Sequence, residues 1–243
     1  MKKEEGNTKV ILKLSGEALS DSSSHLIFSK EKLRNIVDLV KELISNNIKV
    51  GIVCGAGNIF RGRIAEENGI PYDEGDYMGM VGTVINLKAI SALLTTNNIK
   101  NKLYSALMVE DVAPKYDKEK ARKELEDGYV ILFAGGVGKV KHTTDTCAAL
   151  RAIEMDAKLI LAGKNGVDGV YNKDPNKYSD AKFIKSITYK EAIKEDLKVM
   201  DKQALELLKD SDVITRVFSM DDFSNFMKVI NGDENIGTTI KKE

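Results

Sequence analysis

The sequence is poor in the residues that build disulfide frameworks and metal sites. Its 243 residues include two cysteines, two histidines, three prolines and no tryptophan. Cys54 and Cys147 are too few for a disulfide framework, and neither lies in a Cys-x-x-Cys or Cys/His cluster of the kind that binds zinc. Such sparse cysteine is typical of a reducing compartment, so we expect a cytoplasmic protein.

Net charge and long apolar runs are also absent. The 37 Lys and Arg residues balance 37 Asp and Glu residues, which argues against charge-driven binding of nucleic acid or of an acidic membrane. The first residues, MKKEEGNTK, lack the apolar run of a signal peptide. The segment 78–94 comes closest to the roughly 18 apolar residues of a membrane span, but Asn86, Lys88 and Ser91 interrupt it at helical spacing. We expect neither a nucleic-acid nor a membrane partner.

The sequence instead alternates short apolar runs with amphipathic segments. Runs such as 9–14 (KVILKL), 49–54 (KVGIVC) and 129–134 (YVILFA) predict buried strands. We expect further strands at 102–108, 158–162 and 213–219, and helices at 30–46, 77–95, 144–155, 190–193 and 202–208. Near-continuous apolar strands separated by helices predict an α/β fold with a mainly parallel sheet, helices on both faces and two lobes in one compact unit.

Two glycine-containing motifs follow the first two predicted strands. In the first of them, Lys13-Leu14-Ser15-Gly16, an ammonium stands at a strand end beside amides that can cradle phosphate oxygens. In the second, 55–62 (GAGNIFRG), glycines allow a sharp turn close to a ligand, and Arg61 is suited to forked contact with a phosphate. Each motif alone is equally compatible with a plain strand–turn junction, and neither matches a P-loop or a dinucleotide fingerprint.

Polar residues also follow the predicted strand at 129–134. A glycine loop leads to His142, Thr143, Thr144 and Asp145 at the start of a helix. Ligands of open α/β sheets bind at the carboxyl ends of the strands, so this cluster is a candidate binding site. The plain alternative is that one of these residues only caps the helix and that His142 is an ordinary loop side chain.

Two further aspartates and one loop complete the candidates. Asp76 precedes the predicted helix at 77–95, where it is either an N-cap or a ligand for sugar hydroxyls. Asp201 precedes the helix at 202–208, where it is either an N-cap or a buried charge partner for Lys13. The segment 165–175 is dominated by turn-forming residues, which fits a plain loop or a nucleotide pocket with Tyr171 near a base.

Taken together, these motifs resemble the bacterial uridine monophosphate kinases of the amino-acid kinase superfamily. The matching strings, in chain order, are KLSGEAL, GAGNIFRG, DYMGM, TTDTCAALRAIE, VDGVYNKDP, ITYKEAI, VMD and GTTI. The resemblance implies a single three-layer α/β/α domain of the carbamate-kinase type over residues 8–243, with residues 1–7 disordered. It implies a UMP-binding lobe at about 8–157 and an ATP-binding lobe at about 158–243.

The resemblance also implies a reaction and an assembly. ATP would donate its γ-phosphoryl group to UMP, giving UDP and ADP, with Mg²⁺ held mainly by phosphates and water and by no protein ligand directly. Phosphoryl transfer depends on positioning and charge neutralisation, which fits Lys13, Arg61 and glycine-loop amides. The family is typically a homohexamer built as a trimer of dimers, for which the apolar helix 78–94 offers a dimer surface, and UTP is the implied feedback inhibitor.

Site roles carry over onto the matching positions of this sequence. The implied catalytic residues are Lys13, Arg61, Asp145 and Asp201. The implied ATP-binding residues are Lys13, Leu14, Ser15, Gly16, Gly57, Arg61, Asn165, Tyr171 and Asp174. The implied UMP-binding residues are Gly55, Ala56, Arg61, Asp76, Val137, Gly138, Lys139, His142, Thr143 and Thr144.

The chain departs from the family pattern at three places. Ala56 stands where the family usually has a glycine, and we expect its methyl to crowd the UMP phosphate slightly. The loop GVGKVKHTTD lacks the family's Asn-Pro-Phe-Phe segment, which leaves the strictness of UMP over CMP open. The region 20–29, which begins with a polar, loop-forming segment, lacks the glycine-rich pattern associated with activation by GTP, so we predict weak or absent activation.

Two alternatives stand beside this interpretation. One is a relative that phosphorylates carbamate, acetylglutamate, aspartate or isopentenyl phosphate; Arg61 and Asp76 favour a nucleotide acceptor instead. The other is a non-catalytic nucleotide sensor on the same fold. The joint presence of Lys13, Asp145 and Asp201 favours catalysis, because ligand binding alone would not require all three.

Overall fold

The computed structural model describes residues 8–21 and 26–243. The predicted disorder of residues 1–7 lies outside this part of the chain, as does most of the predicted loop at 20–24. The three-layer α/β/α arrangement expected from the sequence is confirmed.

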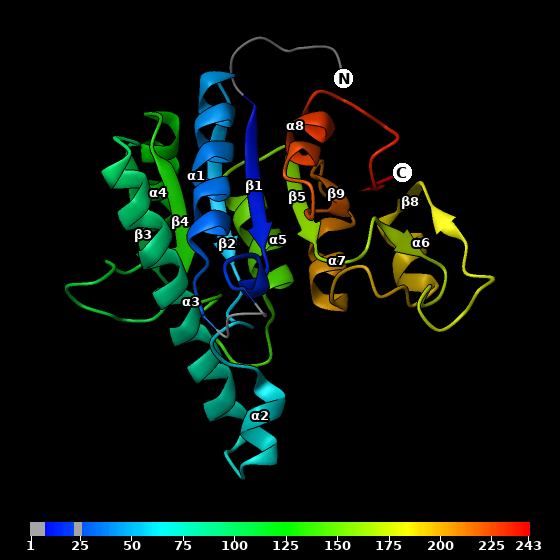
Figure 1. Ribbon diagram of the computed structural model, residues 1–243, viewed down its shortest axis with the longest axis horizontal. Helices are drawn as coiled ribbons and strands as arrows, with labels where there is room; N and C mark the ends of the chain where they lie inside the picture. The colour runs from blue at the N-terminus through cyan, green and yellow to red at the C-terminus, as the bar shows by residue number, and fades with distance from the viewer. Residues whose placement is uncertain (1–7, 22–25) are drawn as a thin grey trace.

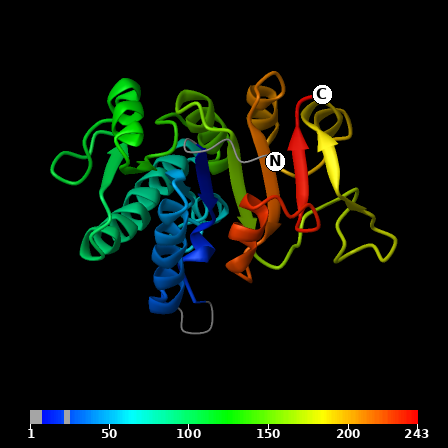
Figure 2. The same cartoon turned by 90° about the horizontal axis from the view of Figure 1, so that it is seen from above.

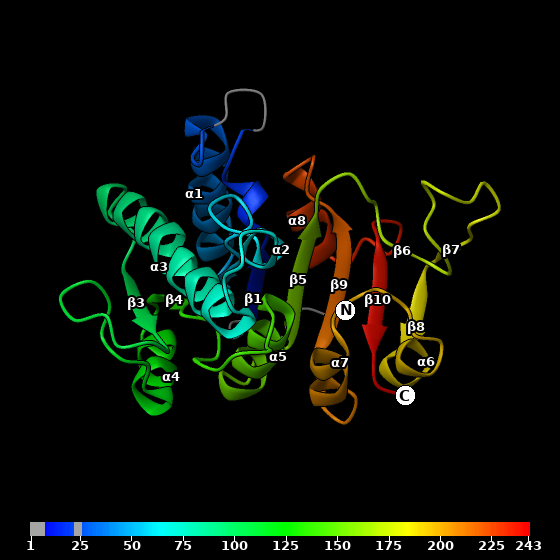
Figure 3. The same ribbon diagram turned by 90° about the horizontal axis from the view of Figure 1, so that it is seen from below.

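An eight-stranded sheet forms the centre of the molecule (Figure 1). Its strands, in order across the sheet, are β3 (Asn101–Ser105), β4 (Val130–Ala134), β2 (Lys49–Cys54), β1 (Lys9–Leu14), β5 (Leu159–Lys164), β9 (Ile214–Ser219), β10 (Thr238–Lys241) and β8 (Ser186–Thr188). Neighbours are parallel from β3 to β9, whereas β10 runs antiparallel to β9. A small sheet of β6 (Val170–Tyr171) and β7 (Phe183–Ile184) lies to one side (Figure 3).

Helices cover both faces of this sheet (Figure 2). One face packs against α1 (Lys30–Ser45), α3 (Tyr72–Thr96) and α8 (Ser224–Ile230). The other packs against α4 (Lys118–Glu126), α5 (Thr144–Glu154), α6 (Tyr189–Lys194) and α7 (Lys202–Leu208). The short helix α2 (Gly62–Glu67) lies beyond the carboxyl ends of the strands, against α3 (Figure 1), and a 3-10 turn, η1 (Gly16–Ala18), follows β1.

The central strand β1 shows how the two cores are separated. Val10, Leu12 and Leu14 are fully buried toward α1 and α3, whereas Ile11 is buried toward α4 and α5. Successive side chains of a strand point to opposite faces. Lys13 therefore points to the α5 face, and this alternation brings its ammonium to the N-terminus of α5.

The main disagreement with the predicted elements concerns α3. The helix was expected to begin at position 77, but it begins at Tyr72, with Pro71 as the N-cap residue. Asp73 and Glu74 place negative charge in the first turn, where the helix dipole favours it. Asp76 thus lies inside the helix, and the alternative that it is an N-cap is wrong.

Other differences are smaller. The strand expected at 102–108 ends at Ser105, because the chain there leaves the sheet. The helices α2, α4 and α8 and the strands β6, β7, β8 and β10 were not expected, since each is short and too polar or too irregular to show a clear period.

Helix α3 is the one described helix that meets the length and composition of a membrane span, with a mean hydropathy of 1.4 over its most apolar window. That test is also passed by core helices, and 44% of this window is buried inside the protein. The fully buried Asn86 lies in the middle of the helix and donates a hydrogen bond to the Gly55 carbonyl. Packing on the sheet therefore accounts for the inner face of α3.

An ion cluster joins the amino ends of β1 and β2 to α4. The Lys9 ammonium lies 2.5 Å from the Glu126 carboxylate, and Lys49, its register partner on β2, pairs with the same carboxylate. Lys9 also lies 3.7 Å from Asp156. The Lys9 side chain is only 8% exposed, so these carboxylates compensate a nearly buried charge. Hydrogen bonds from Lys49 and Lys9 hold the pKa of Glu126 below its usual range.

We predict that Glu126→Gln lowers the free energy of unfolding at pH 7 by roughly 1–3 kcal/mol, because it leaves Lys9 partly unpaired. A carboxyl group whose folded-state pKa is lowered contributes stability above its unfolded value, near 4.5, and loses it as pH falls through the folded value. Denaturant titrations should therefore show a difference between wild type and variant that shrinks as pH is lowered below about 4.5.

Glu119→Gln is the matched control, since Glu119 is exposed on the same helix and lies 4.0 Å from Lys118. It should change stability by a few tenths of a kcal/mol at most, about the value of an exposed pair. Equal effects of the two substitutions would contradict a special role for the Glu126 cluster.

Candidate functional site

The carboxyl ends of β1, β2, β4 and β5 meet at one edge of the sheet, where the candidate residues lie. β1 has β2 on one side and β5 on the other. The chain leaves β1 toward β2 and returns, after β4, to the opposite side. Open α/β sheets bind ligands in the crevice at such a switch point. The fold therefore brings the loops that follow these strands together around one crevice.

The loops after β1 and β2 are in direct contact. The Gly55 N–H donates to the Leu14 carbonyl at 2.9 Å. A Cβ on Gly16 would lie 2.5 Å from the backbone nitrogen of Gly57, so no other residue fits there without a shift. The buried Ser15 hydroxyl has no hydrogen-bond partner among the described residues. Backbone amides and an unpartnered hydroxyl thus face one another in a cradle suited to phosphate oxygens. The side chain of Leu14 is buried in the core, so Leu14 contributes only backbone atoms to the cradle.

An ion pair crosses this cradle. The Lys13 Nζ lies 2.9 Å from Oδ1 of Asp145, and the two side chains are 13% and 21% exposed. Asp145 is the second residue of α5, and Thr143 caps that helix by accepting from the Asp145 and Thr146 amides. The helix N-terminus carries partial positive charge, which stabilises the carboxylate there and any phosphate that approaches.

Asp201 does not pair with Lys13, so the alternative of a Lys13–Asp201 charge pair is wrong. It is the N-cap of α7 and accepts from the Ala204 amide at 2.9 Å. Its carboxylate also accepts from the Thr143 hydroxyl, from the Thr146 amide at 3.1 Å and from the Thr146 hydroxyl. One carboxylate thereby joins the N-termini of α5 and α7.

Lys164 is a second lysine at this edge, and the sequence motifs did not predict it as a site residue. Ala162 is the register partner of Lys13 on β5, and Lys164 stands two residues further on, on the same face of the sheet. Its ammonium donates to the Val199 carbonyl at 2.9 Å. Burial lowers the pKa of Lys164; the Asp145 carboxylate opposes this shift and the Lys13 ammonium adds to it. Two ammonium groups therefore accompany one paired carboxylate at this edge.

Arg61 lies at the rim of the site. It is the N-cap residue of α2, but its side chain makes no capping hydrogen bond. Its guanidinium pairs with Glu17 at 2.7 Å and donates to the Gly57 carbonyl at 3.3 Å. Both side chains are well exposed, at 62% and 41%. Glu17 therefore holds Arg61 beside the glycine loops and competes with any anion for it.

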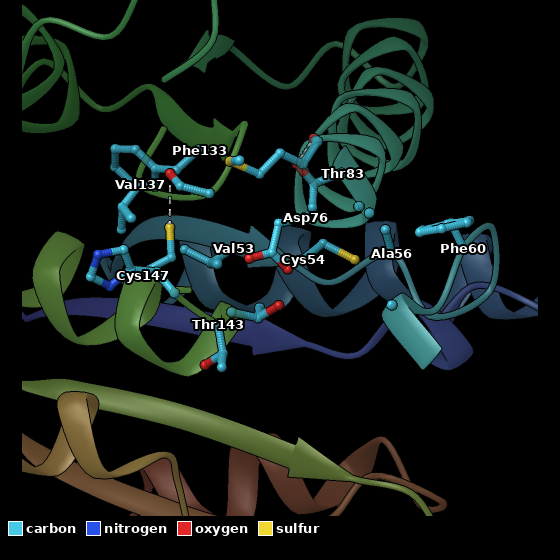
Figure 4. A pocket seen from close by; sticks show the side chains of 17 residues that line it. Val53, Cys54, Ala56, Phe60, Asp76, Thr83, Phe133, Val137, Thr143 and Cys147 are labelled. Atoms are coloured by element: carbon cyan, nitrogen blue, oxygen red, sulfur yellow. Dashed lines mark hydrogen bonds between the residues drawn. The ribbon is translucent and has the colours of Figure 1, made fainter. Parts of the chain in front are cut away.

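A cavity of about 250 Å³ opens between α3, the loop after β4 and the N-terminus of α5 (Figure 4). Its walls include six of the residues implied for UMP: Ala56, Asp76, Val137, His142, Thr143 and Thr144. Four others, Gly55, Arg61, Gly138 and Lys139, lie outside its walls. Residues not expected there also line it, namely Val53, Cys54, Phe60, Gly62, Gly75, Gly79, Met80, Thr83, Phe133, Gly136 and Cys147.

The cavity has a polar rim and an apolar interior. Asp76 projects into it from α3 and accepts a hydrogen bond from the Lys141 amide at 2.6 Å. Burial raises the pKa of the Cys54 thiol to about 12 and that of Cys147 to about 11. Both thiols stay protonated near neutral pH and act as apolar wall atoms. Such a cavity suits a flat, neutral ring with polar substituents at its mouth.

The methyl group of Ala56 packs against α3. A Cβ on Gly82 of α3 would lie 2.8 Å from the Ala56 Cβ, so the helix leaves space for this methyl through its glycine. The expectation that this methyl crowds the UMP phosphate slightly stays a prediction.

The residues implied for ATP divide into two groups. Lys13, Ser15, Gly16 and Gly57 lie in the cradle, whereas Asn165, Tyr171 and Asp174 follow β5 and lie outside the walls of the cavity. The Tyr171 hydroxyl donates to Asp168 at 2.9 Å, and its ring packs edge-on against Phe183. The Gly166 amide donates to Asp221 at 3.0 Å, which fixes the start of this loop. The second group therefore forms a separate wall next to the cradle.

Within residues 8–21 and 26–243, no group of three or more His, Cys, Asp or Glu side chains is placed to hold a metal ion. A magnesium ion carried by a nucleotide needs only one or two carboxylates besides phosphates and water. Asp145, at the edge of the cradle, is such a carboxylate, so the residues present fit an ion that arrives with the nucleotide.

Some of the unexpected residues had a visible signal in the sequence. Asn86 is a lone amide in an apolar helix, and Lys164 repeats the pattern of Lys13, a lysine at the end of an apolar strand. Glu17 and Cys147 had no such signal, because their place in the site depends on which loops the fold brings together.

Known proteins are similar to this chain over nearly its whole length. The model of the Amino acid kinase family matches residues 8–219. A uridylate kinase of Mycoplasma capricolum subsp. capricolum is 42% identical over 222 residues, which cover 91% of this chain and 93% of that protein. A uridylate kinase of Campylobacter jejuni is 41% identical over 234 residues, covering 96% and 97%.

Solved structures agree with these sequence matches. A UMP kinase from Bacillus anthracis superposes with a TM-score of 0.91 at 35% identity, covering 96% of each chain. A UMP kinase from Ureaplasma parvum superposes with a TM-score of 0.90 at 33% identity, covering 97% of this chain and 99% of that one.

The geometry of Asp201 yields a prediction. Asparagine is as good an N-cap as aspartate, but its single acceptor oxygen cannot serve the donors of both α5 and α7. We expect Asp201→Asn to lower the free energy of unfolding by roughly 1.5–3 kcal/mol, the range for hydrogen bonds to a charged group, and to reduce turnover more than ATP binding. Thermal unfolding, steady-state kinetics and ATP titration measure the three effects.

Asp117→Asn is the control, because Asp117 caps only α4, through the Lys120 amide at 2.9 Å. It should leave stability nearly unchanged. If Asp201→Asn, like Asp117→Asn, changes neither the free energy of unfolding nor the turnover, Asp201 is an ordinary cap.

Proposed function

This chain belongs to the amino acid kinase family, and on that premise we propose that it transfers the γ-phosphoryl group of ATP to UMP, giving UDP and ADP. The observation that carries the proposal is the Lys13–Asp145 pair at 2.9 Å, which lies between a phosphate cradle and a cavity for an acceptor. The uridylate kinases and UMP kinases to which the chain is similar support the same acceptor and a place in pyrimidine nucleotide synthesis.

The acceptor occupies the cavity of 250 Å³. Its uracil lies among the apolar interior residues, with Thr143, Thr144 and His142 at the mouth for the polar edge of the ring. The Asp76 carboxylate, which here accepts from Lys141, takes the ribose hydroxyls. Arg61 closes on the phosphate from the rim, with Gly55, Ala56, Val137, Gly138 and Lys139 supplying the surrounding backbone.

Lys13 bridges the donor and acceptor phosphates in this proposal. Asp145 fixes the ammonium at 2.9 Å and so keeps it pointed into the crevice. Charge develops on the transferring group, and a preorganised ammonium, glycine amides and a helix N-terminus stabilise it without rearranging. No residue needs to act as a nucleophile, because the UMP phosphate itself attacks.

The donor lies across the cradle, toward residues 158–243, with UMP bound by residues 8–157. Leu14, Ser15, Gly16 and Gly57 provide amides and a hydroxyl for its phosphates, and Asn165, Tyr171 and Asp174 hold adenosine. Bound Mg²⁺ neutralises phosphate charge, with Asp145 as the carboxylate placed to order its water shell and Asp201 holding the helix that carries Asp145.

The proposal extends to assembly, regulation and location. We propose a cytoplasmic enzyme, in keeping with two free, buried cysteines. We propose a homohexamer built as a trimer of dimers, with UTP as feedback inhibitor. A stripe of exposed apolar side chains on the outer side of α3 supports the dimer: Tyr77, Met78, Val81 and Ile85 are 43%, 42%, 49% and 45% exposed.

A coupled assay of ADP release tests the acceptor. UMP, CMP, AMP and the non-nucleotide acceptors of related kinases are each offered with Mg-ATP. Release that depends on UMP supports the proposal. Release with another acceptor alone assigns a different kinase, and the absence of ADP release with every acceptor favours the non-catalytic nucleotide sensor.

Arg61 and Glu17 make a pair of predictions of opposite sign. Arg61→Ala should raise the KM for UMP roughly ten- to a hundredfold, because it removes a charge-assisted contact of about 1.5–3 kcal/mol. Glu17→Gln should lower the KM for UMP by freeing the guanidinium. Neither should change the inhibition constant of uridine, which lacks the phosphate, measured in competition with UMP. An Arg61→Ala enzyme with unchanged UMP dependence would refute the contact.

The stripe on α3 predicts a change of assembly. Val81→Glu places a charge at the centre of the stripe, where a second copy would have to bury it. Analytical ultracentrifugation should show a hexamer for the wild type and a smaller species for the variant. Lys88→Glu, a charge reversal on the same helix, serves as the control. A wild type that is monomeric at micromolar concentration removes this part of the proposal.

A further inference from the structure

Helix α3 touches both glycine loops of the acceptor cavity through a set of inward-facing residues. Gly82, Thr83 and Asn86 lie within five positions and share one side of the helix. All three are buried. None of the three is implied as a binding residue for ATP or UMP, yet each contacts a loop that contains residues implied for UMP.

Asn86 holds the loop after β2. Its side-chain amide is fully buried and donates to the Gly55 carbonyl at 2.7 Å. Its amide and that of Asn58 exchange hydrogen bonds of 2.8 and 3.1 Å. Asn58 donates in turn to the Ile27 carbonyl at 2.8 Å. A buried amide in an apolar helix is costly unless it is satisfied, and this one is satisfied only by the loop.

Thr83 holds the loop after β4. Its hydroxyl accepts from the Gly135 amide at 2.8 Å and donates to the Met80 carbonyl at 2.6 Å. Gly135 has a φ of +71°, and a Cβ there would lie 2.8 Å from the Leu107 amide nitrogen. The loop therefore turns sharply at the residue that Thr83 anchors, just before Val137 enters the cavity wall.

Gly82 acts by shape. A Cβ at this position would lie 2.8 Å from the Ala56 Cβ, closer than two carbon atoms can approach. Position 56 and position 82 therefore share a volume that accommodates one methyl group. In this protein the methyl group is that of Ala56 in the loop, and position 82 of the helix is a glycine.

We propose that Gly82, Thr83 and Asn86 are positioning residues that set the geometry of the acceptor site. They fix the loop that carries Gly55 and Ala56 and the loop that carries Val137 relative to one rigid helix, so they set affinity for the acceptor. The loop that Thr83 holds contains no residue implied for ATP, so changes at Thr83 leave affinity for ATP unaffected. The inference rests on the proposed UMP kinase activity.

Kinetics of the intact enzyme tests the inference. Asn86→Leu and Thr83→Val each remove the loop contact and should raise the KM for UMP about fivefold, the effect of one hydrogen bond of average strength. For Thr83→Val, the KM for ATP should stay within about twofold, because the loop that Thr83 anchors carries no residue implied for ATP. Asn86→Leu also loosens the loop that carries Gly57, so both KM values should rise in that variant. Thr83→Ser keeps the hydroxyl and should restore the wild-type KM for UMP.

Ser91→Ala is the matched control. Ser91 lies on the same helix and its hydroxyl bonds the Asn101 side chain at 2.7 Å, away from both loops. It should leave both KM values unchanged. The inference is overturned if either Asn86→Leu or Thr83→Val leaves the KM for UMP unchanged, or if Thr83→Val raises the KM for ATP as much as the KM for UMP.

A second pair of variants keeps the test decisive if Asn86→Leu does not fold. Gly82→Ala should raise the KM for UMP by displacing Ala56, and adding Ala56→Gly should restore it, because the methyl then moves from loop to helix. Failure of the double variant to restore the KM would contradict the shared volume. A wild-type enzyme that does not phosphorylate UMP refutes the proposed function. A wild type that phosphorylates UMP, together with α3 variants whose KM for UMP is unchanged, refutes only the inference.

Discussion

The ion pair between Lys13 and Asp145 is the contact on which the rest of the site depends. It joins the end of the central strand to the N-terminus of α5 at 2.9 Å, with both side chains largely out of solvent. A lysine this deep needs a carboxylate partner, and the helix N-terminus stabilises that carboxylate. The pair thereby points one ammonium into the crevice where the carboxyl ends of the strands meet.

Around this pair, the fold supplies positive charge in rigid form. Glycine loops after β1 and β2 approach so closely that a Cβ on Gly16 would collide with Gly57. Lys164 adds an ammonium from the neighbouring strand, and Asp201 fixes the two helices on that face. On the other face, α3 supports the acceptor cavity. The N-terminus of α5 serves both sides of the site, because Asp145 pairs with Lys13 and Thr143 and Thr144 line the acceptor cavity.

Much of this arrangement could be predicted from the sequence, because it depends on local patterns. Apolar runs of the strand type gave β1, β2 and β4, and the motif order identified the family, which the comparisons confirm. Asp76 was misplaced at a helix start because Gly75 and Gly79 obscure the period of the first turns of α3. The sequence does not predict Lys164 as a site residue, because the apolar run ends at Ala162, two residues before the strand ends.

The tertiary contacts of the site could not be predicted from the sequence. Asp201 was expected at an N-cap, where it lies, but its bonds to Thr143 and Thr146 depend on α5 and α7 meeting. Asn86 was visible only as an interruption of an apolar helix, and its partner Gly55 is 31 residues away along the chain. Roles that depend on which loops face one another follow from packing, and no periodicity encodes them.

The most direct test of the Lys13–Asp145 pair is a double-mutant cycle in the turnover of UMP and ATP to UDP and ADP. If the two residues act as one unit, Lys13→Met and Asp145→Asn each lower kcat by roughly 10²-fold or more, and the double variant is little worse than either. Losses that simply add, or a Lys13→Met enzyme that keeps its turnover, would contradict the account.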